Sequence, residues 1–332
     1  MRYQSIFDYL VYQYRKNPRS LGAFAARQIK ADFRITLTGT PVENDISEFY
    51  NILDLSVPGI WGYAGHGTRK KAENQKYIAK RCSKPFILRR TKPQVLTDLP
   101  PKEETLMYLN FSEEEKQNYL KTLLRIKTDL ENANSGKKYG YVLEGLLRLR
   151  QLCLWQQDSI ESTKIRFLME TLEQIMPEGH QAIIFSQFTS YLNRIETHFN
   201  NRHWKFSRID GSQSIKKRQT QVEQFQSGKT PLFLISLKAG GVGLNLTAAN
   251  YVFIMDPWWN PAVENQAIDR AHRIGQKNKI FVYKPIIKDS VEEKVLYLQD
   301  QKRKLFKDLM QDDDQETFSG KLSMDDFMFL LS

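Results

Sequence analysis

Five short apolar runs that alternate with helical patterns dominate residues 181–288. The runs are rich in β-branched and aromatic residues and span Gln181–Phe188, Lys205–Asp210, Pro231–Ser236, Tyr251–Asp256 and Ile280–Ile287. Apolar residues at helical spacing fill the intervals at Tyr191–Asn200, Ile215–Gln226 and Pro261–Ile274. Such alternation predicts an α/β fold, a parallel sheet with helices on both faces. Ligands of such sheets bind beyond the carboxyl ends of the strands.

Helix-forming segments flank this region on both sides. Upstream, within residues 111–175, Ser112 followed by Glu113–Glu115 has the composition of a helix start. The leucines at 143, 146, 147, 149 and 152 recur at helical spacing, which predicts a packed core rather than a binding surface. Downstream, Ser290 and Glu293 form a capping-box pattern that opens a charged helix to about Met310.

The bulk properties of the chain limit the classes of protein to which it can belong. Its 332 residues suffice for two or more compact units with their own cores. No run of about 18 apolar residues and no signal-peptide pattern occurs, so we expect no membrane span. Cys82 and Cys153 are far apart and the five histidines are scattered, so we expect a reducing compartment and no metal site.

The net charge of +11 is concentrated near the start of the chain. Residues 1–100 hold 17 Lys and Arg against 8 Asp and Glu, whereas the rest of the chain holds 32 against 30. The clusters are Arg69–Lys71, Lys80–Arg81 and Arg89–Lys92. A surplus this concentrated favours contact with a nucleic acid over a merely soluble surface.

The segment Gln266–Gln276 suggests a specific chemistry. On a continuous helix, Gln266, Arg270 and Arg273 are spaced four and three apart and share one face. Two forked guanidiniums beside an amide suit the spread charge of a triphosphate during hydrolysis, which is the role of an arginine finger. The alternative from these residues alone is a solvated basic helix face.

Three other connections also carry candidate binding groups. Gly240, Gly241 and Gly243, flanked by Lys238 and Asn245, form a loop whose backbone can cradle an anion, or a tight turn without a ligand. A dinucleotide-binding fingerprint is not expected, because the last glycine of the G-x-G-x-x-G pattern is missing and no clear helix follows the loop.

The second connection holds two adjacent tryptophans, Trp258 and Trp259, which favour core or interface packing over stacking on bases. The third is Thr38–Pro41, which follows an apolar strand at Arg34–Leu37. Its threonine hydroxyls lie at a strand end, where they can contact a phosphate; on its own, the segment is only a turn.

Together, ordered segments of the chain resemble the motifs of the SWI/SNF-type helicase-like ATPases, double-stranded-DNA translocases of helicase superfamily two. The resemblance covers about residues 15–310, and six motifs in the expected order make it specific. The segments are Leu37–Asn44, Pro85–Lys92 with Leu99–Lys102, Ile183–Phe188, Asp210–Ser212 with Arg218, Ser236–Thr247 and Gln266–Gln276.

The resemblance implies the C-terminal half of such a translocase, with the tail of the first RecA-like lobe and all of the second. It implies ATP and Mg²⁺ held mainly by the first lobe, with double-stranded DNA and the chain's own N-terminal lobe as partners. The implied catalytic residues are Arg270, Arg273 and Gln266, and the implied nucleotide-binding residues are Gly241, Gly243, Asn245 and Asp269. The implied DNA-binding residues are Ser186, Gln187, Arg218, Lys238, Thr38, Thr40, Arg89 and Arg90.

The same resemblance divides the chain into four parts. Residues 1–100 correspond to the tail of the first lobe with a helical protrusion and the linker, and 101–165 to a helical insertion of the second lobe. Residues 166–288 correspond to the second lobe itself, and 289–332 to a C-terminal helix and tail. We expect a bacterial or archaeal cytoplasmic protein, or a nuclear one if the source is eukaryotic.

The chain departs from the family pattern at the nucleotide grip. No GxxxxGK[ST] sequence occurs, and Tyr12–Arg15 stands where the acidic Asp-Glu box is expected. A further departure, Leu152–Trp155, affects no known chemistry. We therefore expect the chain by itself to be inactive as an ATPase. Two alternatives stay open: a non-catalytic DNA-binding or regulatory module derived from the family, and a Rossmann-like cofactor enzyme, which the missing fingerprint disfavours.

Overall fold

The computed structural model describes most of the chain beyond residue 97 and parts of the chain before it. The described residues are 10–11, 20–29, 31, 33–37, 46–60, 84–88, 90, 92–96, 98–132, 138–156, 161–237, 239, 244–311 and 324–331. Of residues 10, 11, 46, 93, 302–311, 324 and 325, only the backbone is described. The chain forms two compact units, Met1–Val95 with Lys304–Lys321, and Leu96–Arg303 with Leu322–Ser332.

The first unit contains a parallel pair of short strands, β1 (Leu10–Val11) and β2 (Thr36–Leu37). The strand expected at Arg34–Leu37 is thus confirmed in its last two residues. The helical elements are α1 (Leu21–Arg27), α2 (Ile46–Ser56), η3 (Lys84–Phe86) and α4 (Lys92–Val95). Ser20 caps α1 by accepting the Ala23 N–H.

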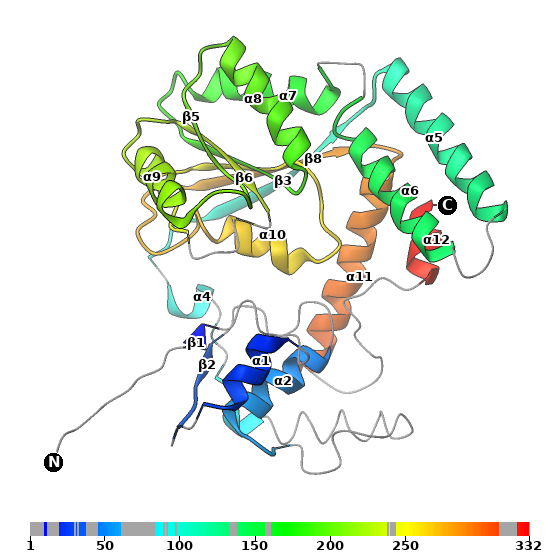
Figure 1. The fold of residues 1–332 in the computed structure, drawn as a ribbon. Helices are drawn as coiled ribbons and strands as arrows, with labels where there is room; N and C mark the ends of the chain where they lie inside the picture. The colour runs from blue at the N-terminus through cyan, green and yellow to red at the C-terminus, as the bar shows by residue number, and fades with distance from the viewer. Residues whose placement is uncertain are drawn as a thin grey trace. The chain divides into compact units, whose positions relative to one another are not determined.

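The second unit is built on a parallel sheet (Figure 1). Its strands are β3 (Lys102–Leu109), β4 (Ala182–Ser186), β5 (Phe206–Ile209), β6 (Leu232–Ser236), β7 (Tyr251–Ile254) and β8 (Ile280–Ile287). Their order is β3-β8-β7-β4-β6-β5, and every neighbouring pair is parallel. The predicted α/β fold is confirmed. The strand β3 was not anticipated, and it pairs with β8 along its whole length, from Lys102 opposite Ile280 to Leu109 opposite Ile287.

Two hydrophobic cores cover the two faces of this sheet, because alternate residues of a strand point to opposite sides. Ile184, Leu234 and Phe253 pack with α7 (Thr163–Ile175) and α8 (Thr189–Asn201) on one face. Ile183, Ile235 and Ile254 pack with α9 (Ile215–Gln226) and α10 (Pro261–Ile268) on the other. Figure 1 shows the two helix pairs on opposite sides of the strands.

A helical layer adjoins the β3 and β8 side of the sheet. It comprises α5 (Glu113–Asn132), α6 (Lys138–Leu152), α12 (Met324–Leu331) and the part of α11 (Val291–Gln311) that runs to Arg303. Ser112 and Glu115 cap α5 reciprocally, since the Ser112 N–H donates to Glu115 and the Glu115 N–H donates to the Ser112 hydroxyl.

The start of α11 and the leucines of α6 differ in part from the sequence expectations. At α11, Ser290 accepts the Glu292 N–H, but Glu293 reaches the N–H of Asp289 rather than that of Ser290. On α6, Leu146 and Leu149 are buried as expected, whereas Leu143 and Leu147 are exposed. None of the described helices is long and apolar enough to cross a membrane.

Candidate functional site

The helix that precedes the predicted arginine fingers is shorter than the sequence pattern indicated. Asn260 caps the start of α10 by accepting the Ala262 N–H, and Pro261 occupies the first turn. The helix ends at Ile268, so the expected continuation to Ile274 is wrong. Arg270 and Arg273 therefore do not share a helical face with Gln266. They lie in a compact loop of tight turns, residues 269–276, which we call the arginine loop.

Tertiary hydrogen bonds hold the arginine loop in place. The N–H of Leu246 donates to the Arg270 carbonyl at 2.9 Å, which takes that carbonyl away from any continuing helix. The Gln276 side chain donates to the Ala249 carbonyl at 2.8 Å and to the Ala271 carbonyl at 3.2 Å. Gly275 has a φ of 99°, a backbone conformation that residues with a side chain rarely adopt. The loop is thus fixed by the body of the second unit.

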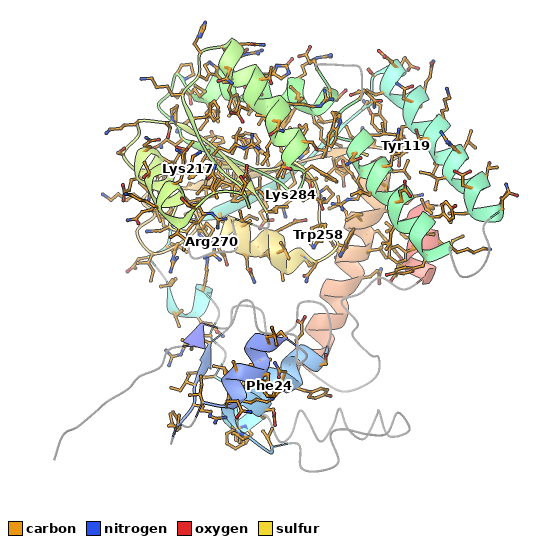
Figure 2. All side chains as sticks on the ribbon, in the orientation of Figure 1. Phe24, Tyr119, Lys217, Trp258, Arg270 and Lys284 are labelled. Carbon is orange, nitrogen blue, oxygen red and sulfur yellow. The ribbon has the colours of Figure 1, made fainter. Side chains whose placement is uncertain are left out.

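The arginine loop lies at the amino-terminal edge of the sheet. The strand β7 leaves the sheet at its carboxyl end, and the eight residues of α10 return over about 12 Å before the loop leads into β8. Arg270 and Trp258 accordingly lie at opposite ends of α10 (Figure 2). The fold class predicts ligand binding beyond the carboxyl ends of the strands. The arginine loop lies at the opposite edge of the sheet, so this expectation does not apply to it.

The described members of the predicted nucleotide group gather around this loop. Arg270, Asp269 and Gln266 are half-buried, whereas Arg273 and Asn245 are exposed. Asn245 directly precedes Leu246, the residue bonded to Arg270. Gly241, Gly243 and Lys238 lie outside the described residues, as do Thr38, Thr40 and Arg89. Among the described residues, no group of His, Cys, Asp and Glu is arranged to hold a metal ion.

The predicted DNA-binding residues lie elsewhere, and several make internal contacts. Ser186 is completely buried at the carboxyl end of β4, where its hydroxyl accepts the Phe188 N–H. Arg218 donates to the carbonyls of Asp210 and Gly211 at 3.2 and 3.4 Å. Arg90 is exposed in the first unit. A DNA contact by each of them stays a prediction.

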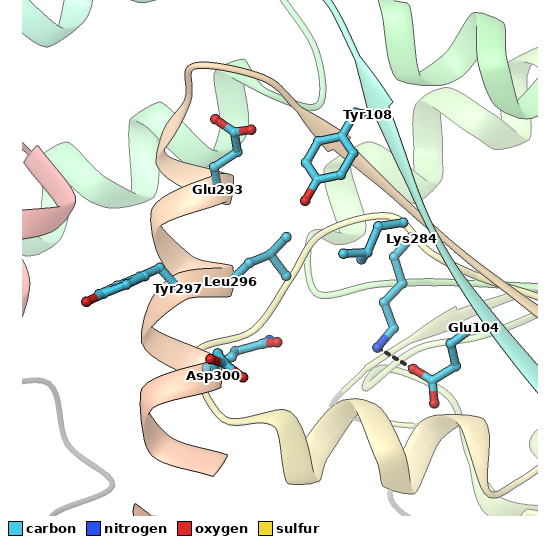
Figure 3. Close-up of a pocket in the computed structure, with 9 residues that line it drawn as sticks. Glu104, Tyr108, Lys284, Glu293, Leu296, Tyr297 and Asp300 are labelled. Carbon is cyan, nitrogen blue, oxygen red and sulfur yellow. Dashed lines mark ion pairs between the residues drawn. The ribbon is translucent and has the colours of Figure 1, made fainter. Parts of the chain in front are cut away.

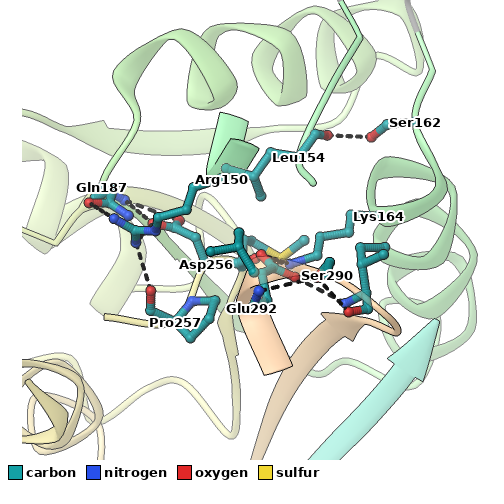
Figure 4. A network of polar contacts seen from close by, with 12 residues as sticks. Arg150, Leu154, Ser162, Lys164, Gln187, Asp256, Pro257, Ser290 and Glu292 are labelled. Atoms are coloured by element: carbon teal, nitrogen blue, oxygen red, sulfur yellow. Dashed lines mark hydrogen bonds and ion pairs between the residues drawn. The ribbon is translucent and has the colours of Figure 1, made fainter. Parts of the chain in front are cut away.

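Arg150, which the sequence did not single out, occupies the centre of a polar network at the carboxyl ends of β4 and β7 (Figure 4). Its guanidinium donates to the Pro257 carbonyl at 2.7 Å and to the Gln187 side chain at 3.2 Å. Asp256, 3.9 Å from the guanidinium, accepts the Gln187 N–H. Burial lowers the pKa of Arg150, although the charge of Asp256 opposes this shift. The side chain of Gln187, which follows the carboxyl end of β4, is thus bonded to the buried Arg150.

Aromatic rings surround the same guanidinium. The ring centroids of Trp258 and Trp259 lie 5.1 and 5.0 Å from Arg150, and that of Phe188 lies at 5.7 Å. The two tryptophans also stack on each other, with centroids 4.1 Å apart. Both tryptophans are half-buried and pack on the guanidinium as a cation–π cage, which agrees with the core or interface packing expected of the pair. Arg150 therefore ties the helix α6 to the connection that leads into α10.

A second buried charge pair lies close to this network. The Lys164 ammonium donates to Glu292 at 2.7 Å and to the Met255 carbonyl at 2.6 Å (Figure 4). Glu292 also accepts the Ile287 N–H at 3.0 Å. Burial raises the pKa of Glu292, and the charge of Lys164 opposes this. The pair links α7 to the end of β7 and the start of α11.

A cavity of about 500 Å³ lies between β3, β8 and α11 (Figure 3). Lys284 forms ion pairs there with Glu104 at 2.9 Å and Glu264 at 3.1 Å. Burial favours the neutral form of Glu104, but bonds and charges from Lys102 and Lys284 lower its pKa to about 2. Lys284 and Glu104 are thus engaged in ion pairs within the second unit, and no residue of the arginine loop lines the cavity.

Comparison with known proteins identifies the family. Residues 13–160 match the SNF2-related domain family, and residues 163–275 match the helicase conserved C-terminal domain family. The structure of a Sulfolobus solfataricus SWI2/SNF2 ATPase core in complex with dsDNA is 30% identical, with a TM-score of 0.57. The similarity covers 95% of this chain and 70% of that one. The chain belongs to the SWI/SNF family of helicase-like ATPases.

Two curated relatives show how the chain relates to longer proteins. An uncharacterized ATP-dependent helicase of Mycoplasma genitalium, MG018, is 36% identical over 93% of this chain and 31% of the relative. The ISWI chromatin-remodeling complex ATPase ISW1 of Saccharomyces cerevisiae is 32% identical over 87% of this chain and 28% of the relative. The chain thus spans under a third of the length of these two relatives. Because the chain belongs to the SWI/SNF family, the alternative of a Rossmann-like cofactor enzyme is wrong.

Proposed function

We propose that this SWI/SNF chain supplies the arginine-bearing half of an ATP-dependent double-stranded-DNA translocase. The observation that carries the proposal is the arginine loop, where the Arg270 carbonyl and the Gln276 side chain are hydrogen-bonded to Leu246 and Ala249, in the segment that precedes β7. Rigid support matters because a finger must meet transition-state charge without reorganising. The Mycoplasma genitalium relative, which is named as an ATP-dependent helicase, supports hydrolysis of ATP as the energy source.

The groups around the loop suit a phosphate ligand. Arg273 is exposed, Arg270 is half-buried, and Asn245 adds an exposed amide nearby in the chain. Bound ATP would supply the phosphoryl group for transfer to water. In the proposal, Arg270 and Arg273 stabilise the charge on that group and Gln266 orients nucleotide or water, while Gly241, Gly243, Asn245 and Asp269 contact the nucleotide. Mg²⁺ is assigned to a first RecA-like lobe, together with the remaining phosphate contacts.

The proposal retains the four-part division of the chain with one adjustment. Residues 1–100 form the end of the first lobe and the linker, and residues 289–332 the C-terminal helix and tail. In the adjusted proposal the second lobe begins at Lys102 and its helical insertion follows at α5 and α6, a division supported by the pairing of β3 with β8. Double-stranded DNA is the proposed partner, with Gln187, Arg218 and Arg90 as its described candidate contacts. The proposed location is the cytoplasm of a bacterium or archaeon.

A second candidate is a DNA-binding or regulatory module without catalysis. The chain has no GxxxxGK[ST] sequence, and Tyr12–Arg15 stands at the acidic-box position. This candidate and the translocase differ in one measurable property, the ATPase activity gained when the chain is joined to a first RecA-like lobe.

The chain by itself is expected to show little or no ATPase activity. Phosphoryl transfer requires a phosphate-binding lysine and a carboxylate-held metal ion, and the sequence pattern of neither is found here. Phosphate release should be measured with the purified chain, with and without duplex DNA. DNA-stimulated turnover of about 1 s⁻¹, within the range of ordinary enzymes, contradicts the prediction.

DNA binding by the chain is expected to be independent of sequence and to weaken steeply with salt. Phosphate contacts release counterions, so affinity falls with a slope of about 0.9 per contact on a log–log plot. Two duplexes of unrelated sequence should be titrated between roughly 50 and 200 mM salt. Arg90→Ala is expected to reduce the slope by about one contact, whereas Lys121→Ala, an exposed lysine of α5, serves as the control. A flat salt dependence contradicts the electrostatic mechanism.

A further inference from the structure

A histidine between the two proposed finger arginines contacts a distant segment of the chain. The Nε2 atom of His272 lies 2.8 Å from the carbonyl oxygen of Pro100, 172 residues away in sequence. A carbonyl oxygen only accepts, so the Nε2 atom must carry the proton that is shared. The ring is half-buried. The contact therefore fixes the tautomer and the orientation of His272.

Pro100 lies where the chain enters the second unit. The first unit runs to Val95 and the second begins at Leu96, and the strand β3 begins at Lys102. The carbonyl of the next residue, Pro101, accepts the Ile280 N–H at 3.1 Å, which aligns β3 with β8. Two consecutive prolines restrict their own backbone and that of the preceding residue, so residues 99–101 form a stiff connection. A displacement of this segment is transmitted along it rather than absorbed.

The arginine loop is thus hydrogen-bonded to two separate segments of the second unit. Arg270 and Gln276 join it to Leu246 and Ala249, within the segment that precedes β7. His272 joins it to the entering segment, which precedes β3. Since His272 lies between Arg270 and Arg273, a pull on Pro100 acts on the backbone that carries both guanidiniums.

We propose that His272 is a positioning residue that couples the path of the entering segment to the placement of Arg270 and Arg273. The inference rests on the proposed function, because it assigns His272 a role in aligning the fingers. Its side chain does not touch the nucleotide; it acts through the Pro100 carbonyl. When the entering segment shifts, the hydrogen bond shifts the arginine loop with it.

The contact itself is tested in the chain as it stands, by amide hydrogen exchange. His272→Ala removes the donor, whereas His272→Gln retains an amide donor at a similar reach. In His272→Ala we expect faster exchange both at Leu99 and in residues 270–273, by about fivefold, the factor that matches a net hydrogen bond of about 1 kcal/mol. His272→Gln should stay within twofold of the wild type. Lys277→Ala, at an exposed neighbour in the chain, is the control.

The coupling is tested in the chain joined to a first RecA-like lobe. His272→Ala should lower the DNA-stimulated kcat at least tenfold, leave the KM for ATP and the thermal midpoint near wild type, and be rescued by His272→Gln. Unchanged exchange at Leu99 in His272→Ala overturns the contact. Wild-type kcat in His272→Ala, with Arg273→Ala inactive, overturns the coupling while the proposed function stands. If Arg273→Ala is also fully active, the proposed function fails, and the coupling fails with it.

Discussion

In the chain joined to a first RecA-like lobe, called the joined protein below, replacing Arg273 by alanine is expected to lower the DNA-stimulated ATPase rate by about 10³–10⁵-fold. The guanidinium is exposed on a loop whose backbone is held by Leu246 and by the Gln276 side chain. A finger stabilises charge that develops in the transition state, so kcat should fall while the affinity for DNA stays nearly unchanged. Arg273→Lys should also be badly impaired, because an ammonium lacks the forked donors of a guanidinium. Steady-state kinetics and a DNA titration provide both measurements.

The matched variants separate chemistry from structure. Arg270→Ala is expected to cause a similar loss of rate, but Arg270 is half-buried, so its thermal midpoint must be compared with that of Arg273→Ala. Lys277→Ala, also exposed near the end of the loop, should keep wild-type turnover. Wild-type kcat in Arg273→Ala would show that this residue is not a finger. A joined protein without any ATPase activity favours the non-catalytic module instead.

The sheet could be predicted from sequence except for one of its two edge strands, β3. The strands β4, β6 and β7 are buried on both faces, so their apolar runs were plain in the sequence. The strand β3 begins Lys102-Glu103-Glu104, which has the composition of a loop. An edge strand pairs on one side only, and solvent accommodates its charged residues. Local composition therefore indicated no strand, and the pairing with β8 decided the outcome.

The end of α10 shows how a tertiary contact overrides a periodic pattern. The spacing of Gln266, Arg270 and Arg273 fits a helix, but spacing does not reveal which carbonyls have other partners. In a continued helix the Arg270 carbonyl would accept the Ile274 N–H. It accepts the Leu246 N–H instead, and Gly275 adopts a positive φ one residue later. The sequence thus suggests which residues form the candidate site, and their roles stay a prediction, but it did not predict their arrangement.

The polar network around Arg150 was missed because a sequence does not distinguish a buried arginine from one on the surface. Arg150 lies four residues after Leu146 on α6, so helical spacing alone places it on the buried face. That spacing was the available signal. What it could not supply was the partners, Asp256 and Pro257, which lie more than 100 residues downstream. The same holds for His272 and Pro100.

Replacing Lys164 by methionine is expected to destabilise the second unit by about 3–5 kcal/mol at neutral pH. The Lys164 and Glu292 side chains are 0% and 1% exposed, and their charged atoms lie 2.7 Å apart. Methionine fills similar volume, so the loss comes from a carboxylate left buried without its cation. The double variant Lys164→Met, Glu292→Gln should recover much of the stability, because the glutamine oxygen still accepts the Ile287 N–H. Urea unfolding of the single and double variants measures the coupling.

The pH dependence and a surface pair distinguish this effect from a general loss of packing. Burial already raises the pKa of Glu292, and loss of the Lys164 ammonium raises it further. A carboxyl with a raised pKa in the folded state binds a proton on folding, so the cost of Lys164→Met should shrink from about pH 8 to about pH 5. Arg202→Gln breaks an exposed pair with Glu173, at 3.0 Å, and should cost only about 0–1 kcal/mol. A Lys164→Met cost that is equally small, or that does not change with pH, means that the buried charge pair does not hold α7 against α11.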